Sequence, residues 1–371
     1  MGIFINYGTD PAAMTQELMR SADVASLLGD VRRVTIKPNL VVARPAAGGA
    51  TTHPEIVEGI ILYLNEHGIS DIAIAEGSWV GADTMRAFEV CGYTALAKKY
   101  GVRLIDTKRD KAILVKSDYC DDLKICESAI DTDFLINVPV LKGHCQTGLT
   151  CCLKNLKGVI PDSEKRRYHS AGLMEPIAAL GGAIKPQLHI IDSICGDLDF
   201  EEGGNPVEAN RILLGFDGVL LDSYCASLIG YHADDIGYLR LARERATRAN
   251  ATWSAHDAGL LEIIEFNSKN KPIMQRKRFD SGAYASMIEA DGACSACYAA
   301  LVYALRQTGN PGKLRKKTGA SLEGSKIKIG QGFRGKKLAG VGSGDCVSGC
   351  KAYVRGCPPS ALDIVEFLTT I

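Results

Sequence analysis

The sequence lacks an excess charge of either sign, a long apolar run and a phosphate-binding loop. Its 371 residues include 43 Lys and Arg and 43 Asp and Glu, so the formal net charge is zero. This balance argues against a nucleic-acid-binding protein. The most apolar long segment, residues 212–231, contains Asp217 and Asp222, and is therefore too polar for a bilayer-spanning helix. No G-x-x-x-x-G-K-[ST] motif occurs, which excludes the standard phosphate loop of nucleotide hydrolases.

The first residues also lack the basic segment followed by an apolar stretch that marks a secretory signal. We therefore expect a cytoplasmic protein that has no membrane partner. Disulfides are rare in a reducing compartment. The 13 cysteines of the chain are consequently expected to be buried thiols or metal ligands.

Strand and helix patterns alternate along the first two thirds of the chain. Helices are predicted at residues 54–67, where Thr52 and Glu55 form a capping box, from Asp83 to about Tyr100, and at 217–229. The predicted strands are short and apolar, and they cover residues 33–37, 71–75, 102–106, 134–141, 188–195 and 211–216. This alternation predicts an α/β fold with a mainly parallel sheet and flanking helices.

The composition changes towards the C-terminus. We place a domain boundary between an α/β core at residues 1–285, in one or two lobes, and a small C-terminal iron–sulfur domain at residues 286–371. Within the latter, residues 310–337 are rich in glycine and basic residues, and Glu323 is their one acid. Ile327 and Ile329 alternate with lysines, which predicts a short, half-exposed strand.

Five cysteines near the C-terminus predict a metal centre. The pair Cys294-Ser295-Ala296-Cys297 is followed by Cys346, Cys350 and Cys357. A C-x-x-C pair lets two thiolates converge on one centre, and a proline after the last cysteine, here Pro358, is typical of iron–sulfur ligation. Four thiolates suit a [4Fe-4S] cluster or a zinc ion. We favour the cluster, because zinc ribbons usually contain two closely spaced cysteine pairs.

Five candidates compete for four ligand positions. Cys294, Cys297 and Cys357 are the first choices. Cys346 is preferred to Cys350 because it follows a Gly-Ser-Gly stretch, which lets the backbone approach a cluster closely; Cys350 is the alternate ligand. The basic stretch would stabilise the reduced cluster and dock an acidic electron carrier of the ferredoxin or flavodoxin type. A solvated loop is the alternative interpretation of that stretch.

Several motifs resemble a known family. They include Lys37-Pro38-Asn39-Leu40-Val41, Ala75-Glu76-Gly77-Ser78, the segment from Asn137 to His144 and the segment from Leu153 to Pro161. These motifs resemble the domain of unknown function 362 family over about residues 1–245 and 290–371. The resemblance implies an α/β fold and, because members often carry iron–sulfur cysteines, a cluster-binding tail. It implies no particular reaction.

The stretch from His144 to His169 also resembles part of the nickel-pincer lactate racemase family. In that family a His is followed ten residues later by a cofactor-holding Lys, and later by a metal-binding His. His144 and Lys154 have this spacing, and His169 lies downstream. Cys151-Cys152-Leu153 replaces the glycines that precede the Lys. The resemblance therefore implies a shared fold and cleft position, but neither nickel nor racemisation.

Polar residues that follow the predicted strands indicate a binding site for a small anionic molecule, because loops at the carboxyl ends of parallel strands hold ligands. The expected catalytic residues are His144 for proton transfer, Lys154 for holding the anion, and His169. The expected binding residues are cationic or donate hydrogen bonds: Lys37, Asn39, Lys142, Asn155 and Lys157. The alternative is structural, with a proline-fixed loop at Lys37 and a solvated helix face at Lys154.

Two further groups are given mainly structural interpretations. Asp192, Asp197, Asp199, Glu201 and Glu202 form an acidic cluster. We expect this cluster to be a solvated loop, and a divalent-cation site is the alternative. Cys145, Cys151 and Cys152 lie near the expected cleft. We expect them to be small buried hydrophobic residues, and redox activity is the alternative.

Together these features predict a cytoplasmic iron–sulfur redox protein. Its [4Fe-4S] cluster would pass electrons to a small anionic substrate or cofactor bound in the α/β core. Two alternatives remain, each with a structural cluster. The first is a cofactor-binding, metal-binding or maturation protein, and the second is a non-redox isomerase or lyase.

Overall fold

The computed structural model describes residues 2–117, 120–248, 261–272, 281–308 and 326–370. The chain forms two compact units. The first, here called the core unit, contains residues 1–165 and 173–278. The second, here called the C-terminal unit, contains residues 166–172 and 279–371. None of the helices within these described ranges is long and apolar enough to cross a membrane.

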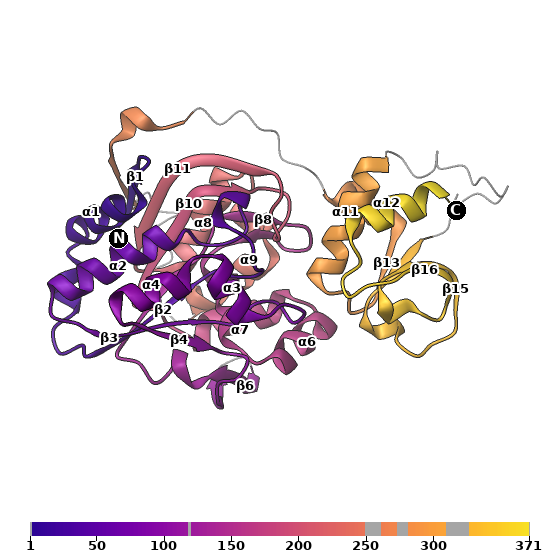
Figure 1. The fold of residues 1–371 in the computed structure, drawn as a ribbon, viewed down its shortest axis with the longest axis horizontal. Coiled ribbons are helices and arrows are strands. Elements are labelled where there is room, and N and C mark those ends of the chain that lie inside the picture. Colours follow the sequence, from indigo (N-terminus) through magenta and orange to yellow (C-terminus); the bar gives the residue numbers. More distant parts are fainter. Residues whose placement is uncertain (1, 118–119, 249–260, 273–280, 309–325, 371) are drawn as a thin grey trace. The chain divides into compact units, whose positions relative to one another are not determined.

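An eight-stranded sheet forms the centre of the core unit (Figure 1). In spatial order its strands are β12 (Glu262–Phe266), β1 (Gly2–Tyr7), β11 (Pro206–Gly215), β10 (Leu188–Asp197), β7 (Phe134–Val138), β2 (Arg33–Pro38), β3 (Asp71–Glu76) and β4 (Arg103–Asp106). Strand β11 runs antiparallel to both of its neighbours, and every other adjacent pair in this sheet is parallel. The prediction of a mainly parallel α/β fold is therefore confirmed.

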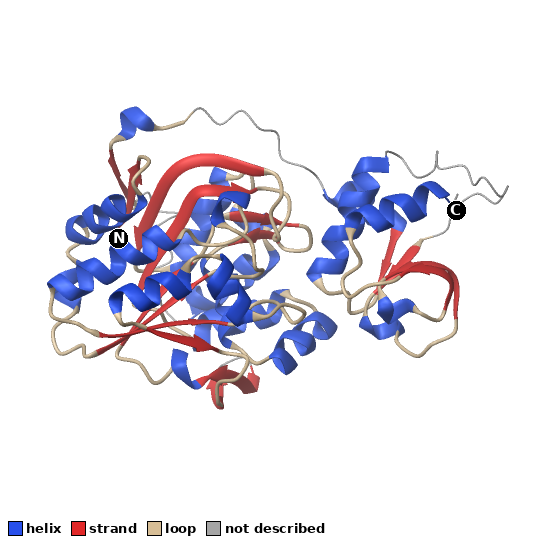
Figure 2. Cartoon of the chain, in the orientation of Figure 1, coloured by secondary structure: helices blue, strands red, loops and turns tan. Residues whose placement is uncertain are grey.

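Helices flank this sheet (Figure 2). They are α1 (Pro11–Ser21), α2 (Pro54–Glu66), α3 (Thr84–Val90), α4 (Tyr93–Tyr100), α5 (Cys152–Asn155), α7 (Met174–Ala183), α8 (Gly218–Leu228) and α9 (Gly237–Arg248). A further helix, α6 (Asp162–Ala171), begins in the core unit, and its residues from 166 on are grouped with the C-terminal unit. Ile212 and Leu214 of β11 join an apolar cluster with α1 and α2. Leu213 points to the opposite face and is also fully buried. Both faces of the sheet are thus covered, as a mainly parallel sheet requires.

Two short hairpins extend from the core unit. One pairs β5 (Ala112–Ser117) with β6 (Cys120–Cys126), and the other pairs β8 (Lys142–His144) with β9 (Gly148–Thr150). The second hairpin corrects the predicted strand at residues 134–141, because β7 ends at Val138 and a separate strand begins at Lys142.

The start of α2 differs from the prediction of a capping box. The N-cap residue is His53, and its side chain makes no capping hydrogen bond. The Thr52 hydroxyl instead donates to the carbonyl of Val138 at 2.8 Å and accepts from the N–H of Asn39 at 2.8 Å. The capping box was therefore wrong, because tertiary partners on the neighbouring strands take up the Thr52 side chain.

The helix predicted from Asp83 begins where expected, because the Asp83 carboxylate accepts hydrogen bonds from the N–H groups of Met85 and Arg86. It ends earlier than predicted. Gly92 adopts a positive φ of 85° between α3 and α4, a conformation that favours glycine. Two short helices consequently replace one long helix.

The C-terminal unit contains a four-stranded parallel sheet. Its strands are β13 (Ile288–Ala290), β14 (Ile327–Ile329), β15 (Leu338–Ser343) and β16 (Cys350–Val354), and its longer helices are α11 (Ser295–Thr308) and α12 (Ala361–Thr370). Ile327 and Ile329 are buried, whereas Lys326 is exposed, which confirms the half-exposed strand. Much of the predicted basic stretch, residues 310–325, lies outside the described residues.

Candidate functional site

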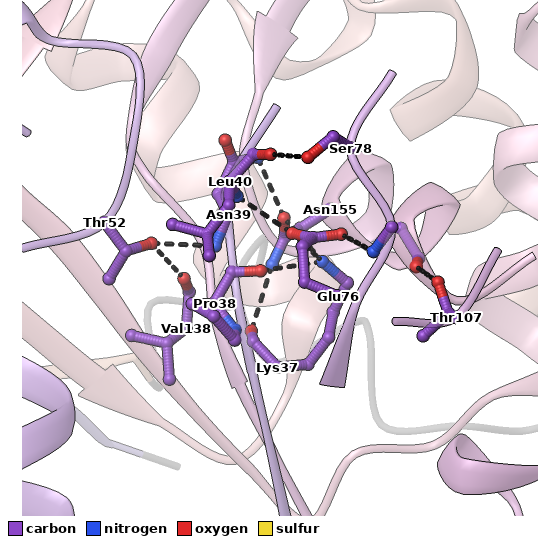
Figure 3. A network of polar contacts seen from close by, with 12 residues as sticks. Lys37, Pro38, Asn39, Leu40, Thr52, Glu76, Ser78, Thr107, Val138 and Asn155 are labelled. Atoms are coloured by element: carbon purple, nitrogen blue, oxygen red, sulfur yellow. Dashed lines mark hydrogen bonds and ion pairs between the residues drawn. The ribbon is translucent and has the colours of Figure 1, made fainter. Parts of the chain in front are cut away.

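Polar side chains meet at the carboxyl ends of three neighbouring strands of the core unit. Lys37 lies at the end of β2, Glu76 at the end of β3, and Asn137 near the end of β7. Asn39 follows β2 and Asn155 ends α5. We call these five residues the strand-end network, and Figure 3 shows most of it. Its position agrees with the general location of ligand sites in parallel sheets.

The Lys37 ammonium group is paired with a carboxylate of the protein itself. Its Nζ lies 2.8 Å from Glu76 Oε2 and donates to the Pro38 carbonyl at 2.8 Å. Both side chains are almost fully buried. Burial lowers the pKa of Lys37, whereas the charge of Glu76 opposes this shift. The positive charge that was expected to hold an anion is thus balanced within the protein.

Asn155 joins the members of the strand-end network. Its Oδ1 accepts hydrogen bonds from Lys37 Nζ at 3.2 Å and from Asn39 Nδ2 at 2.9 Å. Its Nδ2 donates to Asn137 Oδ1 at 2.8 Å. The amide therefore orients side chains from β2, from the segment that follows β2 and from β7, as Figure 3 illustrates for Lys37 and Asn39.

Lys142 connects this network to a second group of charged residues. Its Nζ donates to Asn39 Oδ1 at 2.9 Å, to the Ala50 carbonyl at 2.6 Å and to the Glu201 carbonyl at 3.0 Å. The side chain is fully buried, and burial lowers its pKa to about 8. Lys142 is therefore a buried cation that can lose its proton near neutral pH, at a position where three acceptors surround it.

The second group is centred on Glu201, in the loop between β10 and β11; we call it the Glu201 cluster. Glu201 Oε1 pairs with Lys154 Nζ, and Oε2 lies 3.1 Å from His144 Nε2. His144 Nδ1 accepts from the N–H groups of Gln146 and Thr147, both at 3.0 Å. This arrangement assigns the ring proton to Nε2, facing Glu201.

Burial and neighbouring charges shift the pKa values of the residues in this cluster in different directions. Burial, reinforced by Lys154, lowers the pKa of His144 to about 4, so the ring is neutral near pH 7. Burial alone would raise the pKa of Glu201, but Lys154 and His144 hold it well below its usual range. Burial and the Glu201 charge raise the pKa of Glu202 to about 7. Two adjacent carboxyl groups with well-separated pKa values are a common arrangement in acid–base chemistry.

Neither expectation for the acidic cluster describes what the structure shows. Asp192 is buried and accepts from His53 Nδ1 at 2.8 Å. The Asp197 carboxylate accepts from the backbone N–H groups of Asp199, Phe200 and Asn205, and so organises the loop. Glu201 pairs with Lys154, which lies 47 positions away in the sequence. That separation left no local signal, so sequence reasoning missed Glu201 as a site residue.

The remaining predicted core residues lie in two places. Lys157, in the short helix Leu156–Val159, is half-buried and acts electrostatically on His144. His169 lies in α6, within residues 166–172, which belong to the C-terminal unit. The structure therefore brings together His144, Lys154, Lys142, Lys37, Asn39 and Asn155, and it groups His169 with another part of the chain.

Four C-terminal cysteines interact with one another. Cys294 precedes α11 and Cys297 lies in its first turn. The Cys297 thiol and the N–H groups of Cys297 and Ala296 donate to the Cys294 sulfur, and these hydrogen bonds lower its pKa to about 6. The pKa of Cys297 is raised by its hydrogen bond to Cys294, by burial, and by the charges of Cys357 and Cys346. The four thiols thus share one electrostatic environment.

Cys350 lies in a different environment. It is buried in a small apolar cluster with Phe333 and Val347. Its pKa is raised by burial, and its charged neighbours are Lys328 and Glu289. The structure therefore separates Cys350 from the other four cysteines near the C-terminus.

A second sulfur-rich group lies in the core unit. The ligand atoms of Cys151, Cys152 and Asp222 all lie within 4.8 Å of one another. These three side chains are fully buried. Their chemistry is compatible with a metal ion. From the sequence, Cys151 and Cys152 were expected to be small buried hydrophobic residues, with redox activity as the alternative, and no role was assigned to Asp222.

Comparisons with known proteins identify partial similarities. Thylakoid-associated protein sll1697 of Synechocystis is 28% identical over 184 residues, which are 48% of this chain and 55% of the relative. The chain thus spans about half the length of this curated relative. The lactate racemase apoprotein from Thermoanaerobacterium thermosaccharolyticum matches with a TM-score of 0.40 and 14% identity, over 61% of this chain and 56% of that one. A Thermotoga maritima protein matches with a TM-score of 0.37 and 13% identity, over 64% and 60%.

A family model covers the part of the chain that contains the strand-end network and the Glu201 cluster. The model, described as Domain of unknown function (DUF362), matches residues 34–227. This region is more than half of the 371 residues, and it confirms the family resemblance read from the sequence motifs. The chain belongs to the DUF362 family.

Proposed function

We propose that this protein is an iron–sulfur redox protein whose C-terminal unit binds a [4Fe-4S] cluster through Cys294, Cys297, Cys346 and Cys357. The observation that carries the proposal is that the segments bearing Cys346 and Cys357 are joined by hydrogen bonds between Asp345 and Gly356, at 3.0 and 2.9 Å. The thiols of Cys346 and Cys357 also act electrostatically on Cys297, which is hydrogen-bonded to Cys294. Cysteine thiolates are the usual protein ligands of such clusters. Cys350 is left out of the ligand set because it packs against Phe333 and Val347.

The spacing of the sulfur atoms favours a cluster over a single zinc ion. Tetrahedral zinc, with Zn–S bonds of about 2.3 Å, needs sulfur atoms about 3.8 Å apart. Among the described residues, the group of ligand atoms within 4.8 Å is Cys151, Cys152 and Asp222, and it contains none of these four cysteines. A [4Fe-4S] core presents a separate iron to each thiolate, and so it accepts ligands that are more widely spaced.

Donors around the sulfur atoms suit an electron-rich centre. Arg334 Nη2 donates to Cys346 Sγ at 3.4 Å, and the N–H groups of Ala296 and Cys297 donate to Cys294. Hydrogen bonds to ligand sulfurs and nearby positive charge stabilise the reduced state of a cluster. When bound, the cluster supplies one-electron transfer.

We further propose that the core unit binds the small anionic substrate or cofactor that receives the electrons. Lys142 and Lys154 supply positive charge at the carboxyl ends of the strands, and Glu201 neutralises Lys154 in the structure as it stands. An anion would bind Lys154 by displacing this carboxylate. His144 would donate a hydrogen bond from Nε2, and Glu202, with a pKa of about 7, would supply or accept a proton near neutral pH.

Exposed cations of the C-terminal unit indicate the kind of partner that would bind there. Arg334, Lys336, Lys337 and Lys351 are all exposed, and Arg334 contacts Cys346 directly. We propose that an acidic electron carrier of the ferredoxin or flavodoxin type docks on these residues. Such an encounter slows as the ionic strength rises, because salt screens the opposite charges.

The redox proposal is tested by reducing anaerobically purified protein with dithionite while recording its visible and EPR spectra. We expect broad absorbance near ~400 nm that bleaches on reduction and returns on reoxidation. Cys357→Ala should abolish this absorbance. Cys350→Ala, a matched control in the same unit, should retain it. A cluster that collapses on reduction would favour a structural role, and therefore a non-redox enzyme or a maturation protein.

A further inference from the structure

Three cysteines and one aspartate meet where α5 and α8 pack together in the core unit. Cys151 and Cys152 lie at the start of α5, and Asp222 and Cys225 lie three positions apart on α8, so they share a helix face. All four side chains are fully buried. This group has no part in the redox site proposed above.

The geometry of the group matches that of a tetrahedral metal site. Cys151 Sγ and Cys152 Sγ are 4.0 Å apart, close to the edge of about 3.8 Å expected for a zinc tetrahedron. An Asp222 oxygen and these two sulfurs all lie within 4.8 Å of one another. The Cys225 thiol is hydrogen-bonded to Cys151, which places a fourth candidate ligand beside one member of this group.

Asp222 is the residue that ordinary apolar packing does not explain. Its carboxylate accepts hydrogen bonds from the N–H groups of Cys152 at 2.6 Å and Leu153 at 3.1 Å. The carboxylate also accepts hydrogen bonds from the thiols of Cys151 and Cys152, so the two sulfurs face it directly. These thiol protons are the groups that a bound metal ion would replace. A cation held between Asp222 and the two sulfurs would then take over the compensation of this fully buried carboxylate.

We propose that Cys151, Cys152 and Asp222 bind one Zn²⁺ ion, with Cys225 as the fourth ligand. Zinc accepts sulfur and oxygen ligands in tetrahedral geometry and undergoes no redox change. Each Zn–S bond replaces an S–H bond, and the proton goes to solvent, so no oxidant or reductant is required. Buried Arg211, an electrostatic neighbour of Cys225, offsets part of the ligand charge.

Such an ion would fix α5 against α8. Lys154 and Asn155 both belong to α5, and they contact Glu201 and the strand-end network. Zinc would therefore be a structural metal ion that helps to position the side chains of Lys154 and Asn155. It would not contact the anionic molecule proposed for the core.

The test is metal analysis of the full-length chain purified from zinc-supplemented medium and dialysed against a chelator. The Cys294→Ala/Cys297→Ala background removes zinc that would bind at the C-terminal cysteines. We expect about one zinc per chain in this background. Adding Cys152→Ala should lower the content at least about tenfold, and adding Cys126→Ala, at a buried thiol elsewhere in the core unit, should not.

Cobalt spectra of the Cys294→Ala/Cys297→Ala protein provide a second test, which does not depend on whether the Cys152→Ala variant folds. Co²⁺ loaded into the Cys294→Ala/Cys297→Ala protein should give thiolate-to-cobalt charge-transfer absorbance and the visible bands of tetrahedral coordination. Cys225→Ser should shift these bands without removing them. The proposal would be overturned if the Cys294→Ala/Cys297→Ala protein contained no more zinc per chain than the same protein with Cys152→Ala added. It would also be overturned if bound cobalt were octahedral and gave no charge-transfer absorbance. None of these readouts depends on iron, so the proposal stands or fails separately from the cluster.

Discussion

At the scale of single residues, Glu201 determines the charge balance of the core site. Its carboxylate pairs with Lys154 and faces His144, and the Lys154 side chain is 2% exposed. Glu201→Gln would leave the buried Lys154 ammonium group without its counter-charge. We expect the free energy of unfolding to fall by about 3 kcal/mol, measured by urea-induced unfolding. Glu208→Gln, at an exposed position of β11, is the control, and equal losses in both variants would contradict this account.

The raised pKa of Glu202 predicts how the free energy of unfolding depends on pH. Its pKa rises from 4.5 to about 7 in the folded protein, so the folded state binds this proton more tightly than the unfolded chain. The residue therefore favours folding at pH values below about 4.5 and costs stability as the pH rises to about 7. Glu202→Gln should gain stability over the unmodified protein by roughly 1–3 kcal/mol between about pH 5 and about pH 8.

The pH prediction is checked by urea unfolding of both proteins across this pH range. Glu208→Gln, whose side chain is exposed on β11, is the matched control. A difference for Glu202→Gln that does not change with pH would show that the Glu202 carboxyl group is solvated in the folded state.

At the scale of elements, the short helix after α5 must approach β2 and β3 closely. A Cβ atom at Gly158 would overlap Glu76 Oε1 and crowd Lys37 Nζ. Gly158→Ala should therefore separate this ion pair and destabilise the core unit by about 1–3 kcal/mol. Gly29→Ala, where nothing lies within 4 Å of the added atom, should change stability by less than about 0.5 kcal/mol. Thermal unfolding followed by circular dichroism compares the two, and similar melting temperatures would be inconsistent with the close approach.

The elements show what sequence can and cannot predict. The strands ending at Pro38 and Glu76 were found because their apolar runs are short and end in polar residues. The capping box at Thr52 was wrong because the partners of that hydroxyl, Asn39 and Val138, come from other segments. The pairing of Lys154 with Glu201 was not predicted for the same reason, because a local sequence pattern carries no information about contacts between distant segments.

At the scale of the whole molecule, the chain divides its chemistry between two units. The core unit contains the strand-end network, the Glu201 cluster and the buried thiols, and the C-terminal unit contains the four cysteines proposed as cluster ligands. The family model at residues 34–227 covers the three groups in the core unit. The C-terminal cysteines lie beyond it, so the iron–sulfur proposal depends on the arrangement of those thiols.

The most direct test of the central claim is the iron and acid-labile sulfide content of anaerobically purified protein. The account predicts about four irons and about four sulfides per chain, both lost in Cys357→Ala and kept in Cys350→Ala. Protein that contains no iron or sulfide, or that holds zinc at Cys294, Cys297, Cys346 and Cys357, would contradict it.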